Sequence, residues 1–130
     1  DTFRFYEINP DVEAIARTWF SFLKDSRAQT EVALGDARVE LERELAAGRS
    51  ADFDMIAVDA FSSDAIPIHL LTAECARVYR RRLAPGGRVC LGFNREENGE
   101  SYSADLRKFF DERGAEIRPK GIIVTAPLQA

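Results

Sequence analysis

Residues 52–72 read DFDMIAVDAFSSDAIPIHLLT, and this stretch decides which fold the chain can take. A nearly continuous apolar run, 53–58, ends at Asp59, and the loop that follows holds a second acid, Asp64, and the only histidine, His69. An apolar run of this length is typical of a buried strand in a parallel sheet that helices cover on both faces. Open sheets of this kind bind ligands at the carboxyl ends of their strands. We therefore expect the strand to carry Asp59 to the rim of a pocket.

Composition limits the class of protein. With 130 residues, 45% hydrophobic and 31% charged, the chain fits one globular domain, 1–130. The net charge of −4 comes from 22 acidic and 18 basic residues that are mixed along the sequence, so no basic footprint for nucleic acid is expected. The densest basic run has four arginines between Arg77 and Arg82, and we expect it to be a solvated helix face. The sequence contains no run of 18 apolar residues, so no membrane span is expected.

The two cysteines, Cys75 and Cys90, lack the spacing of metal ligands, and we expect no metal site. A domain of this size needs no disulfide, so two unpaired cysteines predict a reducing, cytoplasmic location. The N-terminal residues include charged side chains instead of the apolar core of a signal peptide.

Strand and helix patterns alternate along the chain. Strands are expected at 3–8, 31–34, 53–58, 88–93 and 121–126. Helices are expected after Asn9-Pro10, from Ala37 to Gly48, from an N-cap at Thr72 to Leu83, and around Leu106 to Phe110. The first helix has the clearest apolar stripe, which we expect to pack on a sheet: Val12, Ile15, Ala16, Trp19, Phe20 and Leu23. The alternation predicts an α/β fold with a mostly parallel, doubly wound sheet and crossover helices.

A nucleotide-binding domain of this type normally begins with a strand and a glycine-rich turn. No GxG element precedes Phe3, so the sequence predicts a partial fold that lacks its first βα unit. The neighbours of an absent strand would have unpaired backbone groups and exposed apolar faces. A homo-oligomer, most simply a dimer, would cover them, and we expect that assembly.

Five short segments together carry a resemblance to a known family. They are FYEINP (5–10), GDAR (35–38), the run from FD at 53–54 to DAF at 59–61, PIHLLT (67–72) and LAPGG (83–87). Their order and spacing over residues 5–93 resemble the spermidine synthase-like members of the S-adenosylmethionine-dependent methyltransferase fold. The resemblance implies a Rossmann-like fold, a small amine as substrate, and S-adenosylmethionine or its decarboxylated form as co-substrate.

The resemblance also implies two groups that bind the nucleoside. Glu7, at the end of its strand, would accept hydrogen bonds from both ribose hydroxyls, since a carboxylate offers two acceptor oxygens to a vicinal diol. Asp36 would accept from the adenine amino group, with Gly35 leaving room for the base and Ala37 starting the helix. The structural alternatives are a solvated acid at a strand-to-helix turn for Glu7 and an ordinary helix N-cap for Asp36.

Asp59 carries the hypothesis about the reaction. In aminopropyl transfer, which the resemblance implies, an amine attacks the carbon beside a sulfonium and neutral methylthioadenosine leaves. Asp59 would attract the cationic amine, orient it and accept its proton; the alternative is a structural acid that caps the loop or the next helix. Asp64 would be a second anionic contact, although its spacing from Asp59 departs from the Asp-x-x-Asp-Pro pattern of polyamine-specific relatives. An isolated histidine such as His69 beside leucines more often serves packing than general-base catalysis.

Three hypotheses on function stay open at the level of sequence. The first is aminopropyl transfer from decarboxylated S-adenosylmethionine to a di- or polyamine. The second is methyl transfer from S-adenosylmethionine with the same nucleoside contacts. The third is a non-catalytic fragment that acts as an oligomerising or scaffold domain.

Overall fold

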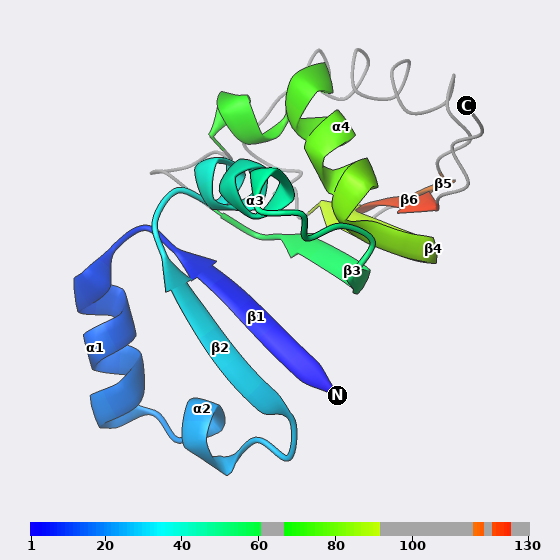
Figure 1. The fold of residues 1–130 in the computed structure, drawn as a ribbon. Coiled ribbons are helices and arrows are strands. Elements are labelled where there is room, and N and C mark those ends of the chain that lie inside the picture. Colours follow the sequence, from blue (N-terminus) through cyan, green and yellow to red (C-terminus); the bar gives the residue numbers. More distant parts are fainter. Residues whose placement is uncertain (61–66, 92–115, 119–120, 126–130) are drawn as a thin grey trace. The chain divides into compact units, whose positions relative to one another are not determined.

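The computed structural model describes residues 1–60, 67–91, 116–118 and 121–125 (Figure 1). The predicted site residue Asp64, the helix around 106–110 and the last residues of two predicted strands lie outside the described residues. The chain divides into two compact units, Asp1–Glu44 and Leu45–Ala130, which we call unit 1 and unit 2. The expected single domain over 1–130 stays a prediction.

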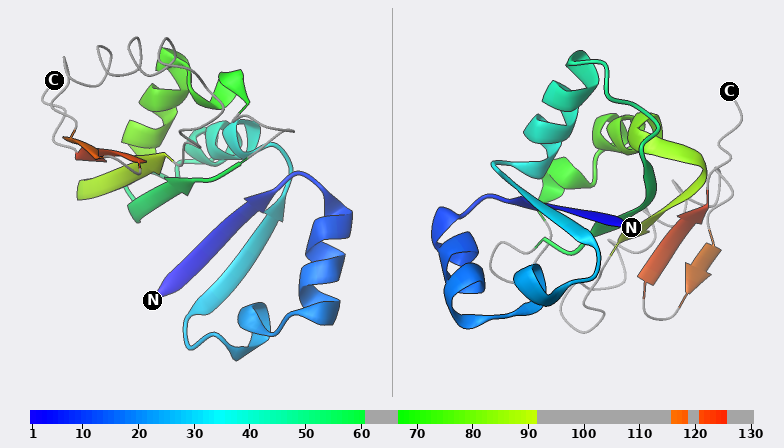
Figure 2. Two further views of the ribbon diagram at one scale, coloured as in Figure 1. Left: turned by 180° about the vertical axis from the view of Figure 1, so that it is seen from behind. Right: turned by 60° about the horizontal axis from the view of Figure 1, so that its bottom comes forward.

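Unit 1 is built on two parallel strands, β1 (Thr2–Glu7) and β2 (Gln29–Leu34), paired from Thr2↔Gln29 to Glu7↔Leu34. Between them run α1 (Pro10–Trp19) and the short α2 (Phe22–Asp25), and α3 (Ala37–Ala46) follows β2. Figures 1 and 2 show α1 and α2 following β1 and leading back to β2, which is the crossover that a parallel pair requires. The parallel strands and crossover helices confirm the predicted α/β class.

Side chains of β1 alternate between two faces that different helices cover. On one face the rings of Phe5 and of Phe22 from α2 pack in a T-shaped arrangement, with 6.1 Å between ring centroids. On the other face, Arg4 and Tyr6 bond to Glu44 of α3. Unit 1 is thus held by apolar contacts on one face and by polar contacts on the other.

Helix α1 begins as the sequence predicts and ends earlier. The Asn9 side chain accepts a hydrogen bond from the Asp11 N–H, and Pro10 occupies the first turn, where its missing N–H costs nothing. The helix ends at Trp19 because Phe20 adopts an extended conformation, with φ −121° and ψ 149°. The expected continuous helix through Leu23 is therefore two helices.

The apolar stripe of α1 is not core, which corrects the sequence prediction. No residue of α1 is buried; Ile15 is 50% exposed and Trp19 79%. A two-stranded sheet offers little apolar surface, and Phe22 of α2 already occupies the place beside Phe5. The helical period therefore predicted the helix correctly but not its burial.

Unit 2 contains a four-stranded sheet in the order β3-β4-β6-β5. Its strands are β3 (Phe53–Val58), β4 (Leu83–Leu91), β5 (Glu116–Arg118) and β6 (Gly121–Thr125). β3 and β4 are parallel, whereas β6 runs antiparallel to both β4 and β5. The 3-10 helix η1 (Ile68–Leu70) and α4 (Ala73–Arg82) lie between β3 and β4 in the chain. Buried apolar side chains from these elements, together with Leu45 at the end of α3, form the core of unit 2: Val58, Leu70, Cys75, Val78, Tyr79, Leu83, Val89 and Leu91.

β3 has the predicted bounds but not the predicted burial. Only Val58 of this strand is buried, and Met55 is 58% exposed. Within the described sheet β3 is an end strand, so one of its edges has no neighbour there. Because Met55 is exposed, the expectation of a strand covered on both faces is wrong for the described residues.

β4 begins five residues earlier than expected. Leu83 pairs with Phe53, and the next pair is Arg88 with Met55, so the Pro85-Gly86-Gly87 turn is an irregularity inside the strand rather than its start. A Cβ on Gly87 would lie 2.9 Å from the carbonyl oxygens of both Ala84 and Phe53. This close approach of backbone explains why glycine is needed there.

The start of α4 was predicted correctly, but its arginine run was not. The Thr72 hydroxyl accepts from the Cys75 N–H, as expected for an N-cap. Arg82 is fully buried instead of solvated. Its Nη1 donates to the Arg49 carbonyl oxygen at 2.8 Å and pairs with Asp52 at 3.2 Å, and its guanidinium lies over the Phe53 ring. No helix among the described residues is long and apolar enough to cross a membrane.

Candidate functional site

The carboxyl ends of β1 and β2 bring three of the predicted site residues together. Glu7 is the last residue of β1 and pairs with Leu34, the last of β2. The Gly35 N–H donates to the Glu7 carbonyl oxygen at 2.8 Å, which extends the pairing beyond the strands. Asp36 follows directly. Glu7, Gly35 and Asp36 are therefore neighbours at one end of the parallel pair, where open α/β sheets bind ligands.

The Glu7 carboxylate is partly used by the turn into α1. Its Oε1 accepts from the Asn9 N–H at 2.8 Å, which fixes the side chain over the turn. No other hydrogen bond to this carboxylate is formed within the described ranges, and Glu7 is half-buried. A carboxylate has about four acceptor positions, so Glu7 retains capacity for a diol.

Asp36 is the N-cap of α3. Its Oδ1 accepts from the Val39 N–H at 3.1 Å, and its carbonyl oxygen accepts from the Glu40 N–H at 2.9 Å. Ala37 is the first residue of α3, as predicted. Asp36 therefore serves as a helix N-cap, the structural role that the sequence allowed. Its role as an acceptor for the adenine amino group stays a prediction.

Gly35 is required by the backbone itself. Its φ of +143° is a conformation that residues with a Cβ rarely adopt. A Cβ there would also lie 2.7 Å from Oε1 of Glu40. The glycine therefore shapes the turn between β2 and α3 whether or not a base packs against it.

Asp59 occupies the corresponding position in unit 2. It follows β3 directly and is exposed, and it makes no hydrogen bond with any described residue. The next helix, α4, is capped by Thr72, so Asp59 does not serve as its cap. Its role toward a substrate stays a prediction, and its predicted companion Asp64 lies outside the described residues.

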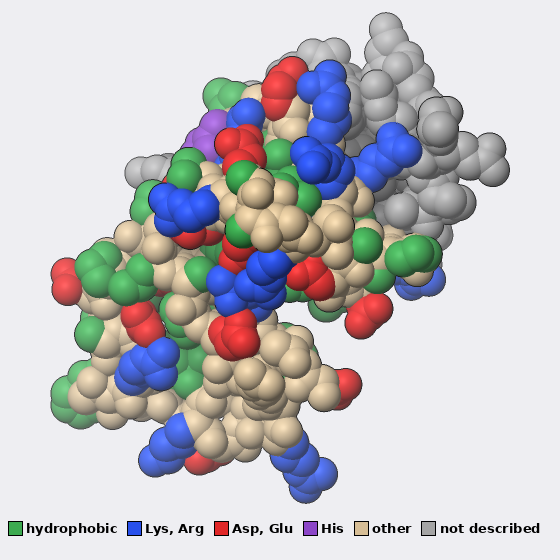
Figure 3. Space-filling model, viewed as in Figure 1, with side chains coloured by type: hydrophobic (Ala, Val, Ile, Leu, Met, Phe, Trp, Pro, Cys, Tyr) green, Lys and Arg blue, Asp and Glu red, His purple; other side chains and the backbone are tan. Residues whose placement is uncertain are grey.

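The remaining sequence predictions concern His69, metal binding and surface charge. His69 is exposed within η1, and its carbonyl oxygen accepts from the Thr72 hydroxyl at 3.5 Å. In the described part of the chain, no group of three His, Cys, Asp or Glu side chains could hold a metal ion. On the face drawn in Figure 3, acidic and basic side chains are interspersed.

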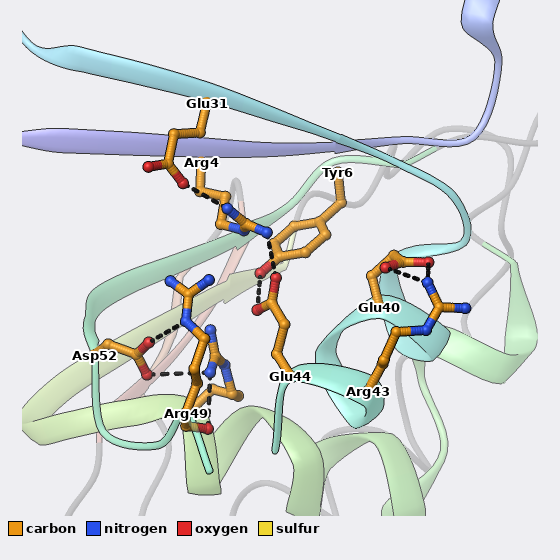
Figure 4. Close-up of polar contacts among 9 residues, drawn as sticks. Arg4, Tyr6, Glu31, Glu40, Arg43, Glu44, Arg49 and Asp52 are labelled. Atoms are coloured by element: carbon orange, nitrogen blue, oxygen red, sulfur yellow. Dashed lines mark hydrogen bonds and ion pairs between the residues drawn. The ribbon is translucent and has the colours of Figure 1, made fainter. Parts of the chain in front are cut away.

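A polar network that sequence reasoning missed joins β1 to α3 (Figure 4). Arg4 pairs with Glu31 through Nη1 and with Glu44 through Nη2, both at 2.5 Å. The Tyr6 hydroxyl donates to the other oxygen of Glu44 at 2.8 Å. The signal available in the sequence was weak: polar residues at alternate positions of a strand whose intervening positions are phenylalanine.

The network changes the titration of its members. Burial alone would lower the pKa of Arg4, but hydrogen bonds to Glu31, Tyr6 and Glu44 outweigh it and raise the pKa. Burial, followed by the hydrogen bond to Glu44 and its negative charge, raises the pKa of Tyr6 above its ordinary value. Both residues therefore keep their protons at neutral pH.

The donor and acceptor chemistry of the strand ends in unit 1 fits a nucleoside. The ribose diol and the adenine amino group both need acceptors, and Glu7 and Asp36 supply carboxylate oxygens. The parallel register and the hydrogen bond between Gly35 and Glu7 hold them at adjacent strand ends.

Comparison with known proteins gives two similarities. The chain is 36% identical over 107 residues to a polyamine aminopropyltransferase from Vibrio vulnificus (strain CMCP6), and the match covers 82% of this chain. It spans about a third, 34%, of that relative's length. No family model matches.

The fold has a solved counterpart. The crystal structure of spermidine synthase from Thermotoga maritima matches 97% of this chain and 46% of the other, with a TM-score of 0.55 and 16% sequence identity. This likeness confirms the predicted partial Rossmann-like α/β fold. Together, the two comparisons show that the chain is similar in sequence to part of a polyamine aminopropyltransferase and in fold to part of a spermidine synthase.

Proposed function

We propose that this chain contributes the donor-binding strand ends and the amine-orienting acid of an aminopropyltransferase. The reaction would move an aminopropyl group from decarboxylated S-adenosylmethionine to a di- or polyamine. The observation that carries the proposal is the adjacency of Glu7 and Asp36 in a chain that is 36% identical to a polyamine aminopropyltransferase.

The nucleoside would be held by the two carboxylates of unit 1. Glu7 would accept from the ribose hydroxyls while its Oε1 keeps the Asn9 N–H, and Asp36 would accept from the adenine amino group while capping α3. Because both strand ends are fixed by backbone pairing, little conformational freedom would be lost on binding.

The chemical step asks little of the protein beyond alignment and removal of a proton. The amine nitrogen would form a bond to the carbon beside the sulfonium, and the carbon–sulfur bond would break with its electron pair going to sulfur. The sulfonium becomes a neutral thioether, so the leaving group needs no acid. Asp59, exposed at the end of β3, would orient the cationic amine and accept the proton that it loses.

Calorimetric titration with methylthioadenosine tests the nucleoside half of this proposal. We expect saturable binding by the wild-type chain and at least about tenfold weaker binding by Glu7→Gln, which keeps the shape but loses charge-assisted acceptance. Glu42→Gln is the matched control, because Glu42 is an exposed acid on α3 that pairs with Arg38. Absence of binding by a folded wild-type sample would overturn the proposal for this chain.

Product analysis distinguishes the two transfer reactions. The same nucleoside contacts would serve S-adenosylmethionine, so methyl transfer remains the second enzymatic hypothesis. Incubation of an amine with each donor in turn, followed by mass spectrometry, separates an aminopropyl product from a methyl product. Methylation without aminopropylation would contradict the leading proposal.

The apolar exposure in unit 1 favours a third, non-catalytic hypothesis, in which the chain is an oligomerising or scaffold piece. Large apolar side chains such as Trp19 and Phe20 are more than half exposed in the structure. The expected homodimer would cover part of this surface. Sedimentation equilibrium measures the mass directly, and a folded monomer at working concentration would argue against this hypothesis.

A further inference from the structure

Glu44 connects α3 to β1 through both of its carboxylate oxygens (Figure 4). Oε1 accepts from Nη2 of Arg4 and Oε2 from the hydroxyl of Tyr6, two residues further along the strand. The Glu44 side chain is only 10% exposed. A nearly buried carboxylate with two charge-assisted or hydroxyl partners is a specific attachment, unlike an exposed surface ion pair.

The attachment lies at one end of α3, and the predicted ligand site lies at the other. α3 has ten residues and is therefore about 15 Å long. Its N-terminus is fixed by the Asp36 cap and by the Gly35–Glu7 hydrogen bond. Its last turn is fixed by Glu44. A helix held at both ends has a defined direction relative to β1, and that direction sets where Asp36 stands relative to Glu7.

The groups around Glu44 have few alternative partners. Arg4 lies between Glu31 and Glu44, and its Nε is buried without a partner among the described residues. Loss of the Glu44 carboxylate would leave the half-buried Tyr6 hydroxyl without its acceptor, and Arg4 would keep one of its two carboxylate partners, Glu31. Unsatisfied buried polar groups are costly, so the helix would be expected to shift rather than keep its place.

We propose that Glu44 is a positioning residue for the nucleoside-binding strand ends: by fixing the last turn of α3 on Arg4 and Tyr6, it sets the separation of Asp36 from Glu7. This inference rests on the proposed function. It concerns a residue that does not touch the ligand, and it predicts that affinity for the nucleoside depends on a contact two helical turns away from it.

Two variants and a control test the proposal. Glu44→Ala removes both contacts, whereas Glu44→Gln keeps an acceptor for Arg4 and an amide group that can bond to the Tyr6 oxygen. Val78→Ala, in the core of unit 2, lowers stability without touching the network. Affinity for methylthioadenosine is measured by calorimetry at a temperature where every variant is folded, and amide exchange of Gly35 and Val39 is measured without ligand.

We expect Glu44→Ala to weaken binding about tenfold and to speed exchange at both amides. Glu44→Gln should stay within about threefold of wild type, and Val78→Ala should leave both quantities unchanged. If the wild-type chain binds methylthioadenosine and Glu44→Ala binds it with the same dissociation constant, the positioning role is overturned and the proposed function stands. A wild-type chain that is folded but does not bind methylthioadenosine would overturn the proposed function and, with it, the assignment of Glu44 to a nucleoside site.

Discussion

The two units are stabilised in different ways. Among the described residues, every buried apolar side chain except Leu41 belongs to unit 2, and every large exposed apolar side chain except Met55 and Ile68 belongs to unit 1. Unit 2 therefore has an apolar core of its own. Unit 1 relies on one strand pair, aromatic contacts around Phe22, and the Arg4–Glu44–Tyr6 network.

This difference in stabilisation matters for the predicted site residues. The predicted nucleoside groups, Glu7 and Asp36, are in unit 1, while Asp59 extends from the strand of unit 2 that contributes Val58 to its core. The precision of a site depends on the rigidity of its supporting residues. In unit 1 part of that rigidity comes from the polar contacts of Glu44 with Arg4 and Tyr6, which are weakened when a single partner is removed.

The largest effect on stability is expected at Arg82. Replacement of Arg82 by Met removes a fully buried guanidinium that holds the Arg49 carbonyl, pairs with Asp52 and covers Phe53. Asp52 is 31% exposed and can be solvated, so the cost comes mainly from the Arg49 carbonyl that loses its donor and from the lost ring contact and ion pair, together about 3 kcal/mol. We expect the free energy of unfolding, measured by urea denaturation, to fall by about 3 kcal/mol.

Its control is the neighbouring arginine. Arg81 is exposed on the same helix, so Arg81→Met should change the free energy of unfolding by less than about 0.5 kcal/mol. Equal effects at the two positions would contradict the assignment of Arg82 to the core of unit 2.

A comparison of Leu91→Ala with Trp19→Ala tests the contrast between the units directly. Leu91 is 4% exposed, so its truncation should cost about 3 kcal/mol. Trp19, although larger, is 79% exposed and should cost less than about 1 kcal/mol. Urea denaturation followed by circular dichroism gives both values.

Trp19 also reports on its own environment. It is the only tryptophan, so intrinsic emission comes from one known position. We expect emission typical of a water-exposed indole and efficient quenching by acrylamide. A blue-shifted, protected emission would show that the stripe of α1 is covered in solution.

Much of the fold could be predicted from the sequence because local signals agreed with it. The Asn9-Pro10 and Thr72 caps marked the starts of helices, and the apolar run at 53–58 gave β3 its bounds. Burial was harder to predict. Periodicity identifies the face that a helix can bury, but what covers that face depends on the rest of the fold, as Trp19 shows.

The functional residues also divide into those that the sequence could identify and those that it could not. Glu7 and Asp36 could be selected because position at a strand end follows from local pattern, and the structure places them side by side. Glu44 and Arg82 could not be selected, because a charged residue on a helix is nearly always solvated. Only the tertiary partners Arg4, Tyr6 and Asp52 distinguish them from the exposed charges around them.

The smallest expected effect concerns the pH dependence of unit 1. Tyr6→Phe removes the hydrogen bond to Glu44 and should lower the free energy of unfolding by about 1 kcal/mol at neutral pH. Because the folded-state pKa of Tyr6 is raised above its unfolded value of about 10, this contribution is complete below pH 10 and is lost as the pH rises through the folded-state pKa. The difference between wild type and Tyr6→Phe should therefore be constant from pH 7 to 9 and shrink above pH 10. Urea denaturation at each pH measures that difference, and other titrating groups cancel in it. A difference that stayed constant through pH 11 would mean that the hydroxyl is not held by Glu44 in solution, and the polar attachment of α3 to β1 would lose one of its two contacts.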